Sequence, residues 1–145
     1  MSNVSVVHSG PWAELDHREF RPAGFPRGLF GKVFLKEDLG LTGMELSLNK
    51  LPPGRQSPFL HRHVEHEELY LVIKGQGQMQ VDGEAVDVRE GTAVRVAPEG
   101  VRALRNVGSE DLYYVCIQAK QGSLSATTIS DGRRVEGPIL WKDQS

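Results

Sequence analysis

Short apolar segments recur at intervals of roughly ten residues between Leu29 and Gln118, with glycine- or proline-containing turns between them. One of them, residues 43–49, alternates strictly between apolar and polar side chains, as a strand with two different faces does. Asp82-Gly83 is a strong hairpin signal. No segment keeps a helical period beyond one or two turns. This spacing predicts an all-β sandwich or barrel.

A chain of 145 residues is long enough for one hydrophobic core and too short for two ordinary domains. Prolines and glycines interrupt the N-terminal part, which predicts an irregular arm, and the last part has weak strand signals that predict an extension packed on the barrel. Within that extension, 126–129 could form an edge strand and 139–141 a final pairing. The expected boundaries are 1–28 for the arm, 29–122 for the barrel and 123–145 for the extension, with Trp12, Phe20 and Phe25 anchoring the arm.

Charge and composition exclude several classes of partner. The 17 basic and 19 acidic residues give a net charge of −2, which offers no basic face for nucleic acid or an anionic membrane. No apolar run approaches the ~20 residues of a membrane span, and residues 1–10 do not resemble a secretory signal. The single cysteine, Cys116, excludes an intramolecular disulfide and a cysteine-based zinc cluster. We expect a cytoplasmic protein whose partner is a small molecule.

Three of the five histidines lie in residues 61–68, among three glutamates. Neutral imidazole and ionised carboxylate are the usual ligands of divalent transition metals. Residues two apart on an extended segment share a face, so His61 and His63 point the same way. Glu68 opens the next strand after a bend, and its carboxylate can return to that side together with the hydroxyl of Tyr70. We therefore predict a metal site made of His61, His63 and Glu68, with His66 and Glu67 in the bend.

The order Gly54, His61-x-His63, four residues, Glu68, six residues, Gly75 resembles the first sequence motif of the cupin family. Residues 91–106, with Pro98-Glu99-Gly100, are similar to the second motif. The resemblance implies a jelly-roll β-barrel, often dimeric. It also implies a metal held by two histidines and a glutamate of the first motif, here His61, His63 and Glu68, and by one histidine of the second.

The second motif lacks that histidine. Its position falls on Ala103, or on Arg102 if the motif slips by one residue, and neither side chain can ligate a metal. Three protein ligands with open positions still form a viable site for Fe, Mn, Ni or Zn. An inward-pointing Arg102 would oppose a cation but attract the carboxylate or phosphate of a substrate.

Several residues have a structural interpretation as well as a functional one. An arginine on a strand is more often at the surface than in a barrel, so exposure is the default for Arg102. The polar face of residues 43–49, which carries Glu45, Ser47 and Asn49, is by default the outer face. Cys116 is expected to be a small buried hydrophobe, and His66 a solvated loop residue.

Three functional hypotheses follow. The first is a metal-dependent oxygenase or isomerase, with Tyr70 in proton transfer and Arg102, Gln56 and Glu45 contacting a small acidic or sugar-like substrate. The second is a non-catalytic module that binds or senses such a ligand without metal. The third is a vestigial structural dimer. A homodimer is expected in any case, because the outward-facing side chains of the strand after the bend are apolar: Leu69, Leu71 and Ile73.

Overall fold

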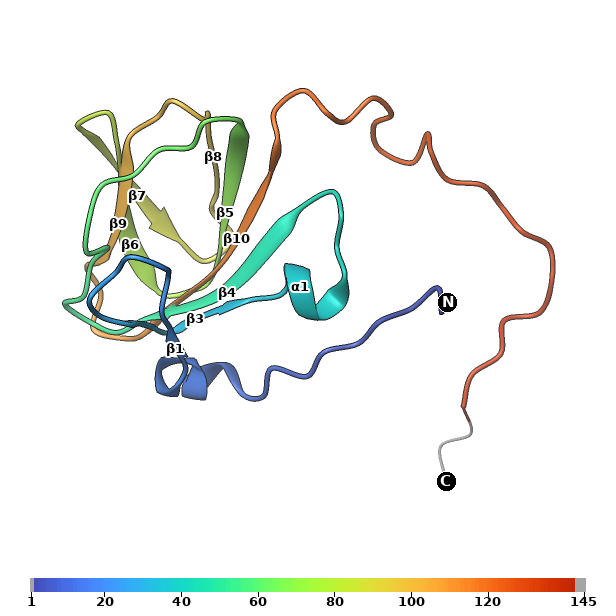
Figure 1. Ribbon diagram of the computed structural model, residues 1–145, viewed down its shortest axis with the longest axis horizontal. Helices are drawn as coiled ribbons and strands as arrows, with labels where there is room; N and C mark the ends of the chain where they lie inside the picture. The colour runs from blue at the N-terminus through green and yellow to red at the C-terminus, as the bar shows by residue number, and fades with distance from the viewer. Residues whose placement is uncertain (1, 143–145) are drawn as a thin grey trace.

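The computed structural model describes residues 2–142, which form β-strands with very little helix. Two sheets face each other across the core, a five-stranded sheet in the order β3-β4-β10-β5-β8 and a three-stranded sheet in the order β7-β6-β9 (Figure 1). The larger sheet contains β3 (Lys32–Phe34), β4 (Glu45–Leu51), β5 (His66–Lys74), β8 (Ala93–Val96) and β10 (Leu112–Lys120). The smaller sheet contains β6 (Gln76–Val81), β7 (Glu84–Arg89) and β9 (Arg102–Asn106).

Alternation along the strands produces this arrangement. In β5 the buried residues are Glu68, Tyr70 and Val72, two positions apart, and the residues between them face outward. The core joins both sheets, since Tyr70 and Tyr114 of the larger sheet cluster with Met79 and Leu104 of the smaller one. The all-β fold predicted from the spacing of apolar segments is confirmed, as is the jelly-roll arrangement that the cupin resemblance implies.

Gly31 divides the mostly apolar segment 29–35 into two strands. The structure has β2 (Leu29–Phe30) paired with β1 (Glu19–Phe20), and a separate β3. Gly31 lies between them with φ +77°, in the left-handed region that favours glycine, and a Cβ there would collide with the carbonyl oxygen of Lys50. The chain therefore changes sheet at Gly31.

The N-terminal arm is fixed to the larger sheet by specific contacts. A 3-10 helix, η1 (Trp12–His17), buries Leu15 and places the Trp12 ring edge-on to Tyr113, with centroids 6.0 Å apart. Lys50 Nζ donates a hydrogen bond to Asp16 Oδ1 at 2.9 Å. Phe20 packs edge-on to Phe34 in β3, as expected of an anchoring residue.

The C-terminal segment differs from its prediction. Residues 123–142 contain no helix or strand, and the chain runs away from the barrel after β10 (Figure 1). Its large apolar side chains, including Leu124, Ile129 and Trp141, are between 78% and 89% exposed. These side chains do not alternate regularly, so the segment presents no continuous apolar face to a sheet edge. Residues 143–145 of the expected extension lie outside the described residues.

The four-residue helix α1 (Lys36–Leu39) lies between β3 and β4. Among residues 2–142, no helix combines the length and apolar character that crossing a membrane requires.

Candidate metal centre in the barrel lumen

Backbone hydrogen bonds hold the histidine segment against the smaller sheet. The N–H of His61 donates to the carbonyl of Arg102, and the N–H of Arg102 donates back to the carbonyl of His61 at 3.0 Å. The N–H of His63 donates to the carbonyl of Pro98. The chain then enters β5, where strand alternation turns Glu68 toward the lumen. Two segments on opposite sides of the bend thus bring three potential ligands together.

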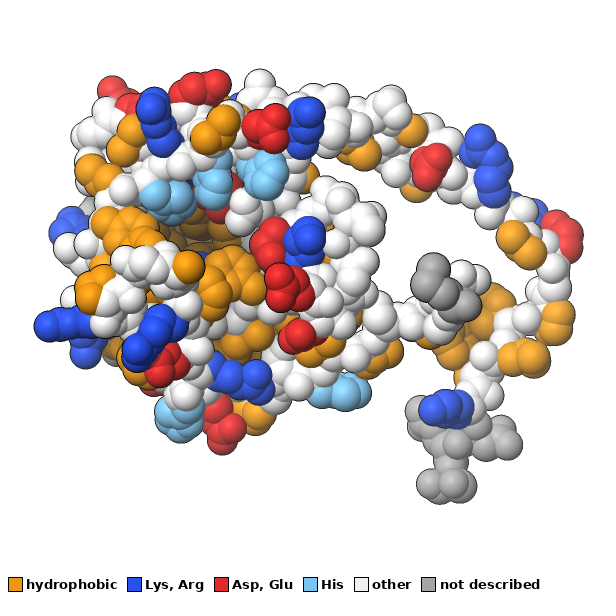
Figure 2. Space-filling view, in the orientation of Figure 1, with side chains coloured by type: hydrophobic (Ala, Val, Ile, Leu, Met, Phe, Trp, Pro, Cys, Tyr) orange, Lys and Arg blue, Asp and Glu red, His pale blue; other side chains and the backbone are white. Residues whose placement is uncertain are grey.

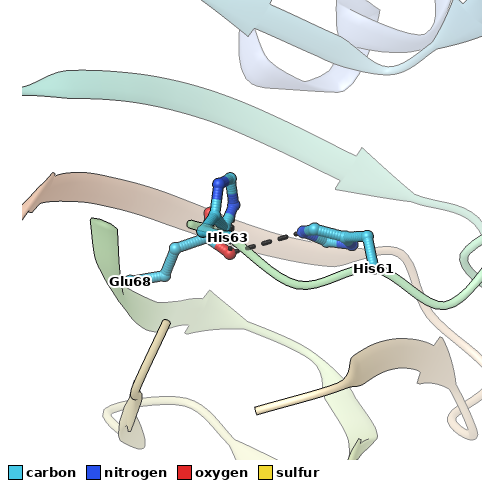
Figure 3. Close-up of side chains that lie close together, drawn as sticks. All are labelled: His61, His63 and Glu68. Carbon is cyan, nitrogen blue, oxygen red and sulfur yellow. Dashed lines mark ion pairs between the residues drawn. The ribbon is translucent and has the colours of Figure 1, made fainter. Parts of the chain in front are cut away.

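Both imidazoles point at the same carboxylate oxygen (Figure 3). His61 Nε2 lies 3.4 Å from Glu68 Oε1, and His63 Nε2 lies 3.2 Å from the same atom. One ligand atom from each of the three side chains lies within 4.8 Å of the others. The grouping predicted from the sequence is therefore present in the structure.

Glu68 is ionised although it is 4% exposed. Burial raises the pKa of its carboxyl group, but the hydrogen bonds from His61, Cys116 and Tyr70 oppose burial, and this pKa is lowered to about 2. Burial also lowers the pKa of the His63 imidazole, which favours the neutral form that ligates metals. Glu68 and His63 thus favour the protonation states in which each can ligate a metal.

The position of Arg102 differs from the exposed position expected from the sequence. Arg102 is fully buried, at 0% exposure, and its Nε lies 3.5 Å from Glu68 Oε1. In β9 the inward-facing residues are Arg102, Leu104 and Asn106, so Ala103 faces the other way. The default of a surface arginine is therefore wrong, and Arg102 rather than Ala103 is the residue that faces the cluster from the second motif.

The donor set fits a divalent metal with three protein ligands. Adjacent ligand atoms at about 2.1 Å from a metal are about 3.0 to 3.4 Å apart in octahedral or tetrahedral geometry, close to the two separations found here. Within residues 2–142, the buried side-chain nitrogen and oxygen atoms without a hydrogen-bond partner are His63 Nε2 and the Nε and Nη1 of Arg102. A metal would satisfy the first of these atoms, and an anion would satisfy the other two.

Tyr70 and Cys116 complete the surroundings of Glu68. The Tyr70 hydroxyl donates to Glu68 Oε1 at 3.0 Å, and the Cys116 thiol donates to Glu68 Oε2 at 3.0 Å. Burial raises the pKa of both groups, so both keep their protons at neutral pH. Cys116 was expected to be a small apolar residue, and its contact with Glu68 was missed. Alternation along β10 was the signal that could have identified this contact, because it places Cys116 on the same face as Tyr114. In the structure, Cys116 pairs directly with Tyr70.

Two further predicted site residues lie elsewhere. Glu45 begins β4, and its Oε1 accepts hydrogen bonds from the backbone N–H groups of Lys36 and Leu46. Gln56 lines a separate cavity of about 510 Å³, together with Gln78 and Arg105 on the outward face of the smaller sheet. The structure does not bring Gln56 together with the three potential metal ligands.

Two other expectations are corrected by the structure. Ser47 and Asn49 are almost completely buried, so the polar face of β4 is the inner face, not the outer one. Register explains this placement, because Asn49 pairs with Tyr114 and Ser47 with Cys116, two inward-facing residues of β10. His66 begins β5 instead of lying in a solvated loop, and its Nδ1 is 2.8 Å from Gln118 Oε1.

Comparisons with known proteins agree with this geometry. The family model described as "Cupin domain" matches residues 47–118, which include the three potential ligands and Arg102. The crystal structure of a cupin protein, BF4112 from Bacteroides fragilis, aligns with a TM-score of 0.73 and 32% identity. That alignment covers 94% of this chain and 100% of the other.

Two curated proteins are similar over shorter regions. The uncharacterized protein MJ1618 of Methanocaldococcus jannaschii is 29% identical over 75 residues, 51% of this chain and 60% of that protein. The oxalate-binding protein of Thermotoga maritima is 29% identical over 68 residues, 47% of this chain and 55% of that protein. The chain thus spans less than two thirds of the length of either curated relative.

Proposed function

The chain belongs to the cupin family, and on that premise we propose that it binds a small carboxylic acid in the barrel lumen, at a divalent metal held by His61, His63 and Glu68. The observation that carries the proposal is the set of buried, unpartnered polar atoms on His63 and Arg102. Buried polar atoms without partners are costly, so their convergence favours a ligand that satisfies them.

Arg102 is the reason for proposing a carboxylic acid as the ligand. Its guanidinium already contacts the lumen carboxylate, and two of its three nitrogens have donors to spare. The remaining one, Nη2, donates to the carbonyl of Ala97 at 3.1 Å, which fixes the plane of the group. A fixed guanidinium binds carboxylates with strong geometric preference. The similarity to an oxalate-binding protein supports the same class of ligand.

A bound divalent metal would supply a Lewis acid with open positions for a substrate oxygen. Residues of the chain would bind and orient the ligand and keep their protons in place. Arg102 orients the acid group, Glu68 stays ionised as a ligand, and Tyr70 holds its proton at the hydroxyl that faces Glu68. This arrangement suits both an oxygenase or isomerase and a protein that binds the acid without turnover.

Titration calorimetry with oxalate tests the proposal and separates its versions. The wild type should bind oxalate, and Arg102→Met should bind it at least tenfold more weakly, as expected for loss of a charge-assisted contact. Arg105→Met, which removes an exposed arginine of the same strand, is the matched control. Binding that survives a chelator would favour the metal-free binding module. Absence of oxalate binding in the metal-loaded wild type would contradict the proposal.

We also propose a homodimer that covers the outer face of β4, β10 and β5. Leu69 and Ile73 are 37% and 42% exposed there, beside outward-facing Val115 and Ile117. Covering such a face with a second sheet would remove apolar surface from water. Light scattering at micromolar concentration should give twice the chain mass, and Leu69→Glu should give the monomer. A monomeric wild type would contradict this proposal.

A further inference from the structure

Lys32 is a second cation on the inner face of the barrel, contributed by the N-terminal edge strand β3. It pairs with Asn49 in the register of β3 and β4, and Asn49 is an inward residue. Lys32 Nζ donates to Asn49 Oδ1 at 2.6 Å and lies 5.4 Å and 6.0 Å from the ring centres of Phe34 and Tyr114. The ammonium group is thus held in a fixed position between two aromatic rings and an amide.

The partners of Lys32 are neutral. Among the residues that the structure describes, no carboxylate lies within ion-pair distance of its Nζ. Asn49 is itself fixed, because its amide donates to Ser47 Oγ and to the carbonyl of Tyr114. Burial lowers the pKa of Lys32, while the negative charge of Glu68 acts in the opposite direction. An ammonium with one hydrogen bond has two donors left for a ligand.

A cavity of about 620 Å³ opens beside Lys32. Its inner wall contains Phe34, His66 and Gln118, and Gln118 pairs with Glu68 in the register of β10 and β5. The cavity therefore borders β5, the strand that carries Glu68. Figure 2 shows a hollow on this face of the barrel, lined by hydrophobic side chains and bordered by histidines and charged groups.

The other charged groups of this cavity belong to its rim, and both signs are present: Arg18, Glu19, Lys36, Glu37, Asp38 and Glu45. Glu19 is paired with Arg21, and Glu45 accepts two backbone hydrogen bonds. These contacts leave Lys32 as the charge set deeper in the cavity without an ionic partner. An anionic group entering from the rim would find this ammonium.

We propose that Lys32 and Arg102 together select a ligand with two acidic groups, one bound at each cation. Lys32 projects from the five-stranded sheet and Arg102 from the three-stranded sheet, so the two cations approach the lumen from opposite walls. This inference rests on the proposed function, because Arg102 is the site of the first acid group there. Lys32 adds the second site, which makes a diacid the preferred ligand over a monoacid.

The test compares diacids with monoamides of the same length by titration calorimetry. The ligand pairs are oxalate with oxamate, malonate with malonamate, and succinate with succinamate; each monoamide keeps the shape and loses one charge. The wild type should bind at least one diacid at least tenfold more tightly than its monoamide. Lys32→Met should abolish that preference while it still binds the monoamide.

Two control variants make the result specific. Lys36→Met removes a lysine at the cavity rim and should keep the preference, and Lys32→Arg, which retains the charge, should keep part of it. Equal affinity for diacid and monoamide in the wild type, or a full preference in Lys32→Met, would overturn the inference. Binding of both ligand types without preference would contradict the inference and remain consistent with the proposed function. Absence of binding of either ligand type would overturn both the inference and the proposed function.

Discussion

Arg102 Nε lies 3.5 Å from Glu68 Oε1, and both side chains are buried inside the barrel. The pair joins β9 of the smaller sheet to β5 of the larger one. Arg102 belongs to the second sequence motif and Glu68 to the first. A cation of the chain itself therefore stands next to the carboxylate of the candidate metal centre. The stability and the metal affinity of the protein should both depend on this pair.

Glu68→Gln should destabilise the protein by about 3 kcal/mol in chelator-treated samples, because breaking one partner of a buried pair leaves Arg102 without a counter-charge. Urea denaturation measures the free energy of unfolding. Glu67→Gln is the control, since Glu67 pairs with Arg95 on the exposed face and should cost less than about 1 kcal/mol. Equal losses in the two variants would contradict the importance of the buried pair.

Arg102→His should raise the affinity for Zn(II) or Ni(II) by about tenfold or more, because it replaces a positive charge with a fourth possible ligand. Arg102→Met removes the charge without adding a ligand, and its affinity should lie between those of the wild type and Arg102→His. Competition with a chromogenic chelator gives the three dissociation constants. If Arg102→His binds no better than Arg102→Met, residue 102 does not occupy the fourth-ligand position.

Asp16→Asn should lower the stability by about 1 kcal/mol at pH 7, because it removes the charge-assisted contact that fixes the arm to Lys50. The hydrogen bond from Lys50 lowers the pKa of Asp16 in the folded protein. Its contribution is therefore present above the unfolded-state pKa of about 3.9 and is lost as the pH falls through the folded-state value.

Urea denaturation of the wild type and Asp16→Asn from pH 7 to pH 2 checks this dependence. Glu19→Gln, in an exposed local pair with Arg21, is the control and should change stability little across the range. A difference between the wild type and Asp16→Asn that stays constant down to pH 2 would exclude the ionic contact as its cause.

Truncation after Gly122 should leave the melting temperature within about 2 °C of the full chain, because the exposed residues 123–142 form no helix or strand and lie away from the barrel. Differential scanning calorimetry at two protein concentrations checks the expectation. A fall of several degrees at both concentrations would mean that the segment packs on its own barrel. A fall that depends on concentration would place it on a second copy.

Local patterns in the sequence were sufficient for the fold and the three ligands. Strand alternation and motif spacing place His61, His63 and Glu68 together without knowledge of any long-range contact. The inward direction of Arg102 could not be derived in the same way. In β9, one face carries Arg102, Leu104 and Asn106, and the other carries Ala103 and Arg105. Each face has one arginine and one apolar side chain, so neither periodicity nor hydropathy selects the inner face.

Lys32 and Asn49 show a second limit of sequence patterns. Their contact depends on the register between β3 and β4. Gly31 sets the start of β3, and the mostly apolar sequence of residues 29–35 does not indicate this break. The polar inner face of β4 was assigned outward because exposure is the usual position of polar residues. Functional lumens reverse that rule, since a ligand-binding interior needs polar side chains.

We propose above that His61, His63 and Glu68 hold a divalent metal. The most direct test is elemental analysis of protein purified without chelator, alongside His63→Ala and the control His8→Ala, whose histidine lies in the N-terminal arm. We expect about one divalent transition metal ion per chain in the wild type and His8→Ala, and less than about one fifth of that in His63→Ala. Substoichiometric metal in all three proteins, even after incubation with excess Fe, Mn, Ni or Zn and desalting, would contradict it.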